Sequence, residues 1–184
     1  YQYFEDKKDL YLHLLGRIVE RKLEYLAPVM ENPFQKEFFS LLREIYGAGL
    51  RFALSNPRLQ RIGTRILADR NNPVLLEFLA ASRGKSDVVF HRLLEAAIAR
   101  GEIRRDIDIP MSAHLISELS QSVADYYLER EGARYDESYM EYVDRMIDFL
   151  RNGIGVPPDR GGQGDPGERH QKPDPPTAEG KDAR

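Results

Sequence analysis

The chain has 184 residues, with 27 Lys and Arg against 30 Asp and Glu, and it contains no cysteine and no tryptophan. A net charge of −3 argues against a protein that coats nucleic acid by bulk charge. The absence of cysteine excludes a disulfide scaffold, a thiolate zinc site and a cysteine nucleophile. Because the sequence has no run of 18 apolar residues and no apolar leader at its first residues, we expect a soluble, cytoplasmic protein with no membrane partner.

The last 32 residues differ in composition from the rest of the chain. Between 153 and 184, 13 residues are Gly or Pro, and the apolar ones are Ile154, Val156, Ala178 and Ala183. Such a segment buries too little surface to offset its ordering entropy. The sequence therefore predicts a disordered tail over 153–184 and a folded body over 7–152.

The body is expected to be helical throughout. Asn32, Asn56 and Asn72 each precede a proline, a pair that suits the cap and first position of a helix, and Gln35 completes a capping box with Asn32. Gly101 and Gly132 are expected to end helices. The predicted helices cover 7–28, capped by Asp6, then 33–54, 57–69, 73–100 with a break near Gly84, 110–131 and 137–152. Since no period-2 alternation is present, the expected fold class is all-α, a multi-helix domain.

Apolar residues repeat at helical spacing in the first and last of these helices. In the first, Leu12, Leu15, Val19, Leu23 and Leu26 share a face, which Tyr11 and Ile18 widen. In the last, the apolar residues cover an arc wider than one intrachain stripe needs, so part of this helix is expected to face a partner. They are Tyr139, Tyr142, Val143, Met146, Phe149 and Leu150.

Enzymatic signatures are absent from the sequence. It contains no G-x-S-x-G, no glycine-rich phosphate loop and no H-E-x-x-H. The four histidines, at 13, 91, 114 and 170, are scattered, and Asp106 and Asp108 are expected to favour the start of the helix at Pro110 instead of holding a metal. We therefore expect no catalytic residue, no metal site and no cofactor.

The first fifteen residues, YQYFEDKKDLYLHLL, carry a motif. Read from physics alone, its lysines are either solvated side chains beside packed aromatic rings or phosphate contacts at a helix start. The motif resembles the segment that ends the helix-turn-helix and opens the next helix in TetR/AcrR-family transcriptional regulators, with matches at Tyr1, Phe4, Lys7 and Leu10. ARGEIRRDIDIPMSA, from Ala99 to Ala113, resembles the turn before the dimerisation helices of that family.

The resemblance implies a division of roles along the chain. Residues 1–6 would end the DNA-binding helix-turn-helix, whose first two helices are absent, as in a truncated product, and 7–152 would form the effector-binding and dimerisation domain. Tyr1, Tyr3 and Lys7 would contact operator DNA, which the intact protein would bind. Tyr126, Tyr127, Tyr139, Tyr142, Met146 and Phe149 would join the last two helices to their mates in a homodimer, as an intersubunit four-helix bundle, or else serve the intrachain core.

The middle helices would enclose a cavity for a small hydrophobic or amphipathic effector. Its expected wall comprises Phe38, Phe39, Tyr46, Phe52, Phe78 and Phe90, with Arg43 and His91 as polar anchors, although each aromatic residue also suits a core position. The leading interpretation is a ligand-responsive transcriptional regulator, a repressor released from DNA by its effector. The alternatives are a helical protein-interaction module without DNA binding and, third, an enzyme.

Overall fold

The computed structural model describes residues 3–69, 71–132 and 134–156. Within these ranges the chain forms six α-helices and one short 3₁₀ helix and has no strand, which confirms the predicted all-α class. The elements are α1 (Lys7–Leu26), η1 (Pro33–Gln35), α2 (Phe38–Ser55), α3 (Pro57–Ala68), α4 (Pro73–Ala99), α5 (Ile109–Glu131) and α6 (Tyr139–Ile154).

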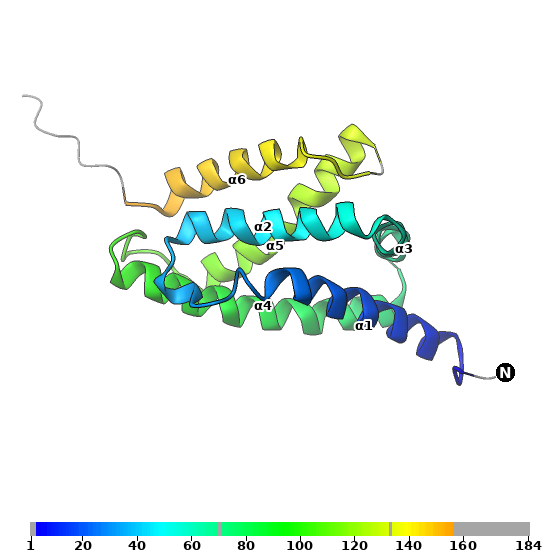
Figure 1. Cartoon of the computed structure of the whole chain (residues 1–184). Coiled ribbons are helices and arrows are strands. Elements are labelled where there is room, and N and C mark those ends of the chain that lie inside the picture. Colours follow the sequence, from blue (N-terminus) through cyan, green and yellow to red (C-terminus); the bar gives the residue numbers. More distant parts are fainter. Residues whose placement is uncertain (1–2, 70, 133, 157–184) are drawn as a thin grey trace, which may run out of the picture.

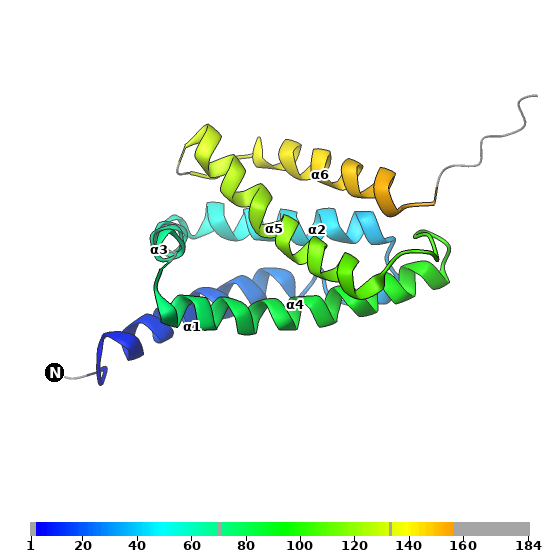
Figure 2. The same cartoon turned by 180° about the vertical axis from the view of Figure 1, so that it is seen from behind.

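Helix α2 lies in the middle of the bundle. Figure 1 shows α6 on one side of α2 and α1 with α4 on the other, while α3 stands across one end. Seen from behind in Figure 2, α5 crosses diagonally from α4 to the start of α6. The first turns of α1 project beyond the bundle at the end where α3 lies (Figure 1). The chain therefore presents a packed body and one protruding helix end.

Side-chain caps begin three of the helices as the sequence predicts. The Asp6 carboxylate accepts a hydrogen bond from the amide of Asp9 at 2.7 Å, and the Asn72 side-chain oxygen accepts from the amides of Val74 and Leu75 at the start of α4. Asp108 accepts from the amide of Met111 at 2.9 Å at the start of α5. These bonds satisfy amides that the first helical turn leaves without partners.

The other two Asn-Pro pairs behave differently. Asn32 adopts a left-handed conformation with φ of 50° and makes no capping bond, so Pro33 begins only η1 and the predicted capping box with Gln35 is wrong. Helix α2 starts at Phe38 instead of Pro33, with Glu37 as its cap. Asn56 directs its amide to the Tyr25 hydroxyl and the Phe52 carbonyl, and this competing bond removes it as a cap for α3.

The glycines predicted to interrupt helices differ in effect. Gly101 and Gly132 have φ of 78° and 99° and follow the ends of α4 and α5, as predicted. Gly84, by contrast, lies inside an unbroken α4, and α6 continues through Gly153 to Ile154. A single helical glycine costs about 1 kcal/mol, which the packing of a long helix easily offsets.

Most buried side chains form one large cluster, which we call the main core. Its members come from α2, the second half of α4, α5 and α6, and include Tyr127, Leu94 and Val143, each fully buried. Tyr127 lies at the centre of several ring contacts, with Tyr139 and Tyr142 edge-on and Tyr135 stacked. The main core thus ties the last two helices to the central helix.

A smaller cluster, which we call the N-terminal cluster, lies at the other end of the bundle. Its buried members are Leu15 of α1, Ile66 of α3 and Leu75 of α4, with partly buried neighbours such as Ile18 and Phe78. The predicted inner face of α1 is therefore rotated. Leu12, Val19 and Leu23 are exposed, whereas Tyr11, Leu15, Ile18, Tyr25 and Val29 face the other helices.

The residues that directly follow α4, Arg100 to Ile103, contact both α2 and α6. Arg100 donates to the carbonyls of Phe34 and Lys36, and the Glu102 carboxylate accepts from the amide of Phe38 at 2.8 Å. Ile103, fully buried, forms an isolated antiparallel bridge with Gly155 after α6. The segment therefore holds the start of α2 and the end of α6 together.

Candidate functional site

The residues expected to meet DNA lie at the protruding end of α1. Tyr1 lies outside the described residues. The Tyr3 side chain is 83% exposed, and Lys7, the first residue of α1, is exposed beside the Asp6 cap. The Phe4 ring contacts the His13 ring, with centroids 5.3 Å apart, which holds this end against the helix.

The residues expected at a dimer interface separate into two groups. Tyr127, Tyr139 and Met146 are buried inside the main core, where they pack against this chain's own helices. Tyr126 and Phe149, by contrast, are 53% and 70% exposed, on α5 and α6. The surface that a partner can contact therefore holds Tyr126 and Phe149 from the expected set, together with the edge of Tyr142. The helical period alone left undecided which of Met146 and Phe149 points outward.

Tyr142 connects the buried group to the exposed group. Its ring lies 5.3 Å from that of Tyr127 and 6.0 Å from that of Tyr126, and its hydroxyl donates to a Glu131 carboxylate oxygen at 2.5 Å. This hydrogen bond to a carboxylate raises the pKa of Tyr142 above its usual value. Two further exposed apolar side chains, Met111 and Leu115, lie on α5 and were not predicted as interface residues.

The eight residues expected around an effector lie in different parts of the body. Phe38, Phe39, Tyr46, Phe52 and Phe90 are buried members of the body, and Phe78 packs against the N-terminal cluster. The Tyr46 hydroxyl hydrogen-bonds the Ser120 hydroxyl at 2.5 Å, and burial raises the Tyr46 pKa.

The two expected polar anchors lie on other surfaces. Arg43 faces α6, where it donates two hydrogen bonds to the Asp144 carboxylate at 2.7 and 3.2 Å. His91 lies 3.5 Å from the Glu95 carboxylate along the surface of α4.

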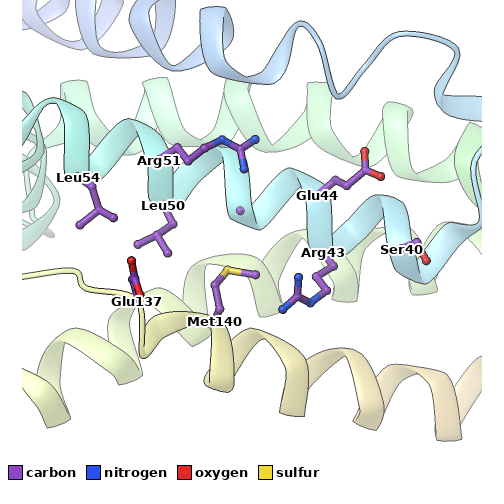
Figure 3. A pocket seen from close by; sticks show the side chains of 9 residues that line it. Ser40, Arg43, Glu44, Leu50, Arg51, Leu54, Glu137 and Met140 are labelled. Carbon is purple, nitrogen blue, oxygen red and sulfur yellow. The ribbon is translucent and has the colours of Figure 1, made fainter.

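A groove of about 520 Å³ runs between α2 and the first turn of α6. In Figure 3, Leu50 and Leu54 of α2 face Met140 and Glu137 across it, while Arg51 points to the other side of α2. Arg43 also lines this groove, although its guanidinium is already paired with Asp144. A second hollow of about 290 Å³, near the start of α3, is lined by Arg61, Arg134 and Tyr135 among others. Both hollows are open and partly charged, unlike the enclosed apolar cavity expected from the sequence.

Two glycines border the contact between α1 and the neighbouring helices α2 and α3. A Cβ atom placed on Gly49 of α2 would meet one atom within 4 Å, the Lys22 Cε at 3.9 Å, and one placed on Gly63 of α3 would meet only Ile18 Cδ1 at 3.8 Å. We call this contact the α1 seam, defined by Ile18 and Lys22 on one side and Gly49 and Gly63 on the other. Lys22 is an exposed residue whose aliphatic chain lies beside Gly49.

The described part of the chain offers no group of three His, Asp or Glu side chains that would hold a metal ion. None of its helices is long and apolar enough to cross a membrane.

Comparison with solved structures is informative, whereas comparison with family models and curated proteins is not. No family model matches the chain, and no curated protein matches it. Among solved structures, a TetR family transcriptional regulator from Chloroflexus aurantiacus J-10-FL matches with a TM-score of 0.63 and 26% sequence identity, over 85% of this chain and 77% of that one. The chain has a TetR-like fold. This TetR-like fold, shared over most of both chains, supports a transcriptional regulator and favours a non-enzymatic protein.

Proposed function

We propose that the chain forms the effector-binding and dimerisation body of a ligand-responsive transcriptional regulator, a cytoplasmic repressor that a hydrophobic or amphipathic small molecule releases from operator DNA. The observation that carries this proposal is the likeness to a TetR family regulator over 85% of the chain. The sequence motifs at Tyr1–Leu10 and Ala99–Ala113 support the same conclusion independently of the fold.

The exposed apolar side chains of α5 and α6 support a homodimer. Phe149 and Tyr126 expose large rings, and Met111 and Leu115 extend the apolar surface along α5. A symmetric pairing would bury the same residues on both subunits, so two copies of α5 and α6 would form a four-helix bundle. The main core fixes both helices against α2, which makes the paired surface rigid.

Effector binding is proposed to act through α1. This helix contacts α2 and α3 across the α1 seam, and it begins at Lys7, just after Tyr3. A small molecule in the seam would tilt α1 and change the separation of the two DNA-contacting ends in a dimer. Half-sites in the major groove lie about 34–36 Å apart, so a shift of a few ångströms would lower affinity for DNA. The effector must bind the tilted state more tightly for this to occur.

DNA contact is proposed for Tyr1, Tyr3 and Lys7. Lys7, the first residue of α1, adds a positive charge at a helix start, where a phosphate is favoured. Such contacts fix the position of the protein on DNA without specifying a base sequence. The test is a footprinting experiment with the product of the complete reading frame on its own upstream DNA, repeated with a library of small molecules. A protected site that one compound abolishes is expected. Absence of any specific protection would instead favour a helical protein-interaction module.

The dimer is tested by two charge substitutions one turn apart. Phe149→Asp should leave the fold intact and weaken dimerisation at least about 100-fold, because an interface aromatic contributes about 2 kcal/mol or more and acts twice in a symmetric pair. Met146→Asp should instead unfold the chain, since it buries an unpaired carboxylate in the main core. Light scattering reports the dimer, and circular dichroism reports the fold.

Val88→Asp is the matched control, because Val88 is 61% exposed on α4 and does not belong to the proposed surface of α5 and α6. The Val88→Asp protein should keep both the dimer mass seen by light scattering and the helix content seen by circular dichroism. A Phe149→Asp protein that remains as dimeric as the unmodified chain would remove this interface, and a monomeric unmodified chain at tens of micromolar would remove the dimer.

A further inference from the structure

Arginine side chains that have no partner are concentrated around α3. Most arginines of the described residues are engaged: those at 17, 21, 43, 83, 100, 104 and 151 pair with carboxylates, and those at 92, 130 and 145 contact aromatic side chains. In the same part of the chain, the arginines with neither kind of partner are Arg51, Arg58, Arg61, Arg65, Arg105 and Arg134. All of these except Arg105 lie on α3, on the last turns of α2, or beside the hollow at the start of α3.

Two of these arginines line one recess. The α3 hollow, as we call the recess of about 290 Å³ near the start of α3, is lined by Arg61 of α3 and by Arg134, which lies between α5 and α6. Figures 1 and 2 both place α3 and the connection from α5 to α6 at the same end of the bundle. Folding therefore brings two arginine side chains from distant parts of the sequence to one recess.

The described residues that line the α3 hollow include no Asp or Glu. Helix α3 has no acidic residue, and the Asp136 carboxylate, which is close to Arg134 along the chain, already accepts hydrogen bonds from the Tyr127 hydroxyl and the Ser138 amide. Glu137 lines the separate groove between α2 and α6. The lining is therefore positively charged, and an oxyanion in the hollow would receive charge-assisted hydrogen bonds.

The remaining lining of the α3 hollow is mostly apolar. Besides the two arginines it consists of one amide side chain, Gln60, and of four apolar or aromatic residues: Ala53, Leu54, Pro57 and Tyr135. The Tyr135 ring is stacked on that of Tyr127 with centroids 5.6 Å apart, which fixes its position. Sites for drug-sized ligands have volumes of about 300–1,000 Å³, so a hollow of about 290 Å³ suits a smaller molecule, one ring with a charged head group.

We propose that the α3 hollow binds a small aromatic carboxylate, whose carboxylate group lies between Arg61 and Arg134 and whose ring lies against Leu54 and Tyr135. Guanidinium groups match a carboxylate with two parallel hydrogen bonds, which an ammonium group cannot do. None of the residues that define the α1 seam lines this hollow. The inference concerns binding to the chain without DNA, so it goes beyond the proposed function and does not depend on it.

A ligand in the α3 hollow would connect the two packed regions of the body. Helix α3 contributes Ile66 to the N-terminal cluster, and Tyr135 packs against the main core. A carboxylate held by both Arg61 and Arg134 would therefore join α3 to the residues that lead into α6. Occupancy of the hollow should make α3 open less often, because a ligand that binds the closed state stabilises it.

The test compares benzoate, benzamide and benzamidinium, which share one shape and differ in charge. Titration of the whole 184-residue chain, followed by the amide chemical shifts of Leu54, Gln60 and Tyr135, should show benzoate binding with a Kd of about 1 mM, as a ligand of this size allows. Benzamide should bind about tenfold or more weakly, because it lacks the charge, and benzamidinium should be weakest. Inorganic phosphate should also bind more weakly than benzoate, because it has no ring.

Substitutions distinguish the two arginines from the general charge of the protein. Arg61→Gln and Arg134→Gln should each weaken benzoate binding about tenfold and leave benzamide binding unchanged, a difference that a merely structural role would not produce. Arg61→Lys should retain part of the preference for benzoate, since it keeps the charge without the paired hydrogen bonds. Arg105→Gln is the matched control, because Arg105 is also exposed and without a carboxylate partner but does not line the hollow. It should change neither affinity.

Hydrogen exchange tests the connection between α3 and Tyr135. Saturating benzoate should slow the exchange of α3 amides, and it should have no such effect on the Arg134→Gln protein at the same concentration. Circular dichroism should show the same helix content for all the variants, since both arginines are exposed.

Equal affinity for benzoate and benzamide, or no binding of benzoate at tens of millimolar, would overturn the inference. A benzoate preference that survives both glutamine substitutions, or that falls equally with Arg105→Gln, would do the same by showing that the hollow does not hold the anion. Phosphate binding as tight as that of benzoate would overturn the aromatic class, and unchanged exchange of α3 would overturn the connection. None of these results bears on whether the complete protein binds operator DNA.

Discussion

The main core and the N-terminal cluster place similar residue types in different packing. The main core draws buried side chains from four helices, and rings such as Tyr127, Tyr135 and Tyr139 contact one another within it. The N-terminal cluster has three buried side chains, and beside it lies the glycine-bordered α1 seam. A densely packed region resists change, whereas a region with few buried contacts opens at lower free energy. This contrast supports the proposed roles, in which the main core holds α5 and α6 for pairing and α1 changes its position.

The largest expected effect comes from truncating one leucine in each region. Leu94→Ala should lower the free energy of unfolding by about 4–5 kcal/mol, because Leu94 is fully buried and its surroundings cannot collapse into the cavity. Leu75→Ala should cost about 2–3 kcal/mol, since the N-terminal cluster has room to relax. Urea unfolding followed by circular dichroism measures both. Equal losses would show that the two regions are packed alike.

A smaller effect is expected at the start of α4, which leads into the N-terminal cluster. Asn72→Ala should cost about 1 kcal/mol, because two amides lose the side-chain oxygen that caps them. The neighbouring Asn71, which is exposed, gives the control Asn71→Ala, expected to change stability by less than about 0.5 kcal/mol.

Hydrogen exchange locates the effect of Asn72→Ala. Amides in the first turns of α4 should exchange faster, while those of α5 and α6 keep their protection, if the N-terminal region opens separately. Uniformly faster exchange would instead show that the chain opens as one unit.

The smallest effect is a gain in stability. Gly63→Ala should raise the free energy of unfolding by about 0.5–1 kcal/mol, because alanine favours the helix and its Cβ would meet only Ile18 Cδ1 at an ordinary contact distance of 3.8 Å. Gly101→Ala, in the body, should cost about 1–2 kcal/mol, since its φ of 78° is strained for alanine. Thermal unfolding distinguishes the two signs, and a destabilising Gly63→Ala would mean that the α1 seam is filled.

The sequence determined the features that depend on neighbouring residues. Asp6, Asn72 and Asp108 cap helices because a short polar side chain can reach amides two or three residues ahead. Gly101 and Gly132 follow helix ends because glycine tolerates positive φ. Helical spacing of apolar residues was enough to predict the all-α class. The Tyr1–Leu10 motif indicated a TetR-like fold.

The tertiary structure decided which face of each helix is buried and which is exposed. Asparagine is a common helix cap, yet the side-chain amide of Asn56 donates a hydrogen bond to the Tyr25 hydroxyl, 31 residues away. Met146 and Phe149 are both apolar and one turn apart on α6, and only the position of α2 and α5 makes the first a core residue and the second a surface residue. Lys22 lies beside Gly49 of α2 only because of the way α1 packs, since helical period gives the angle between side chains but not the direction of the neighbouring helix.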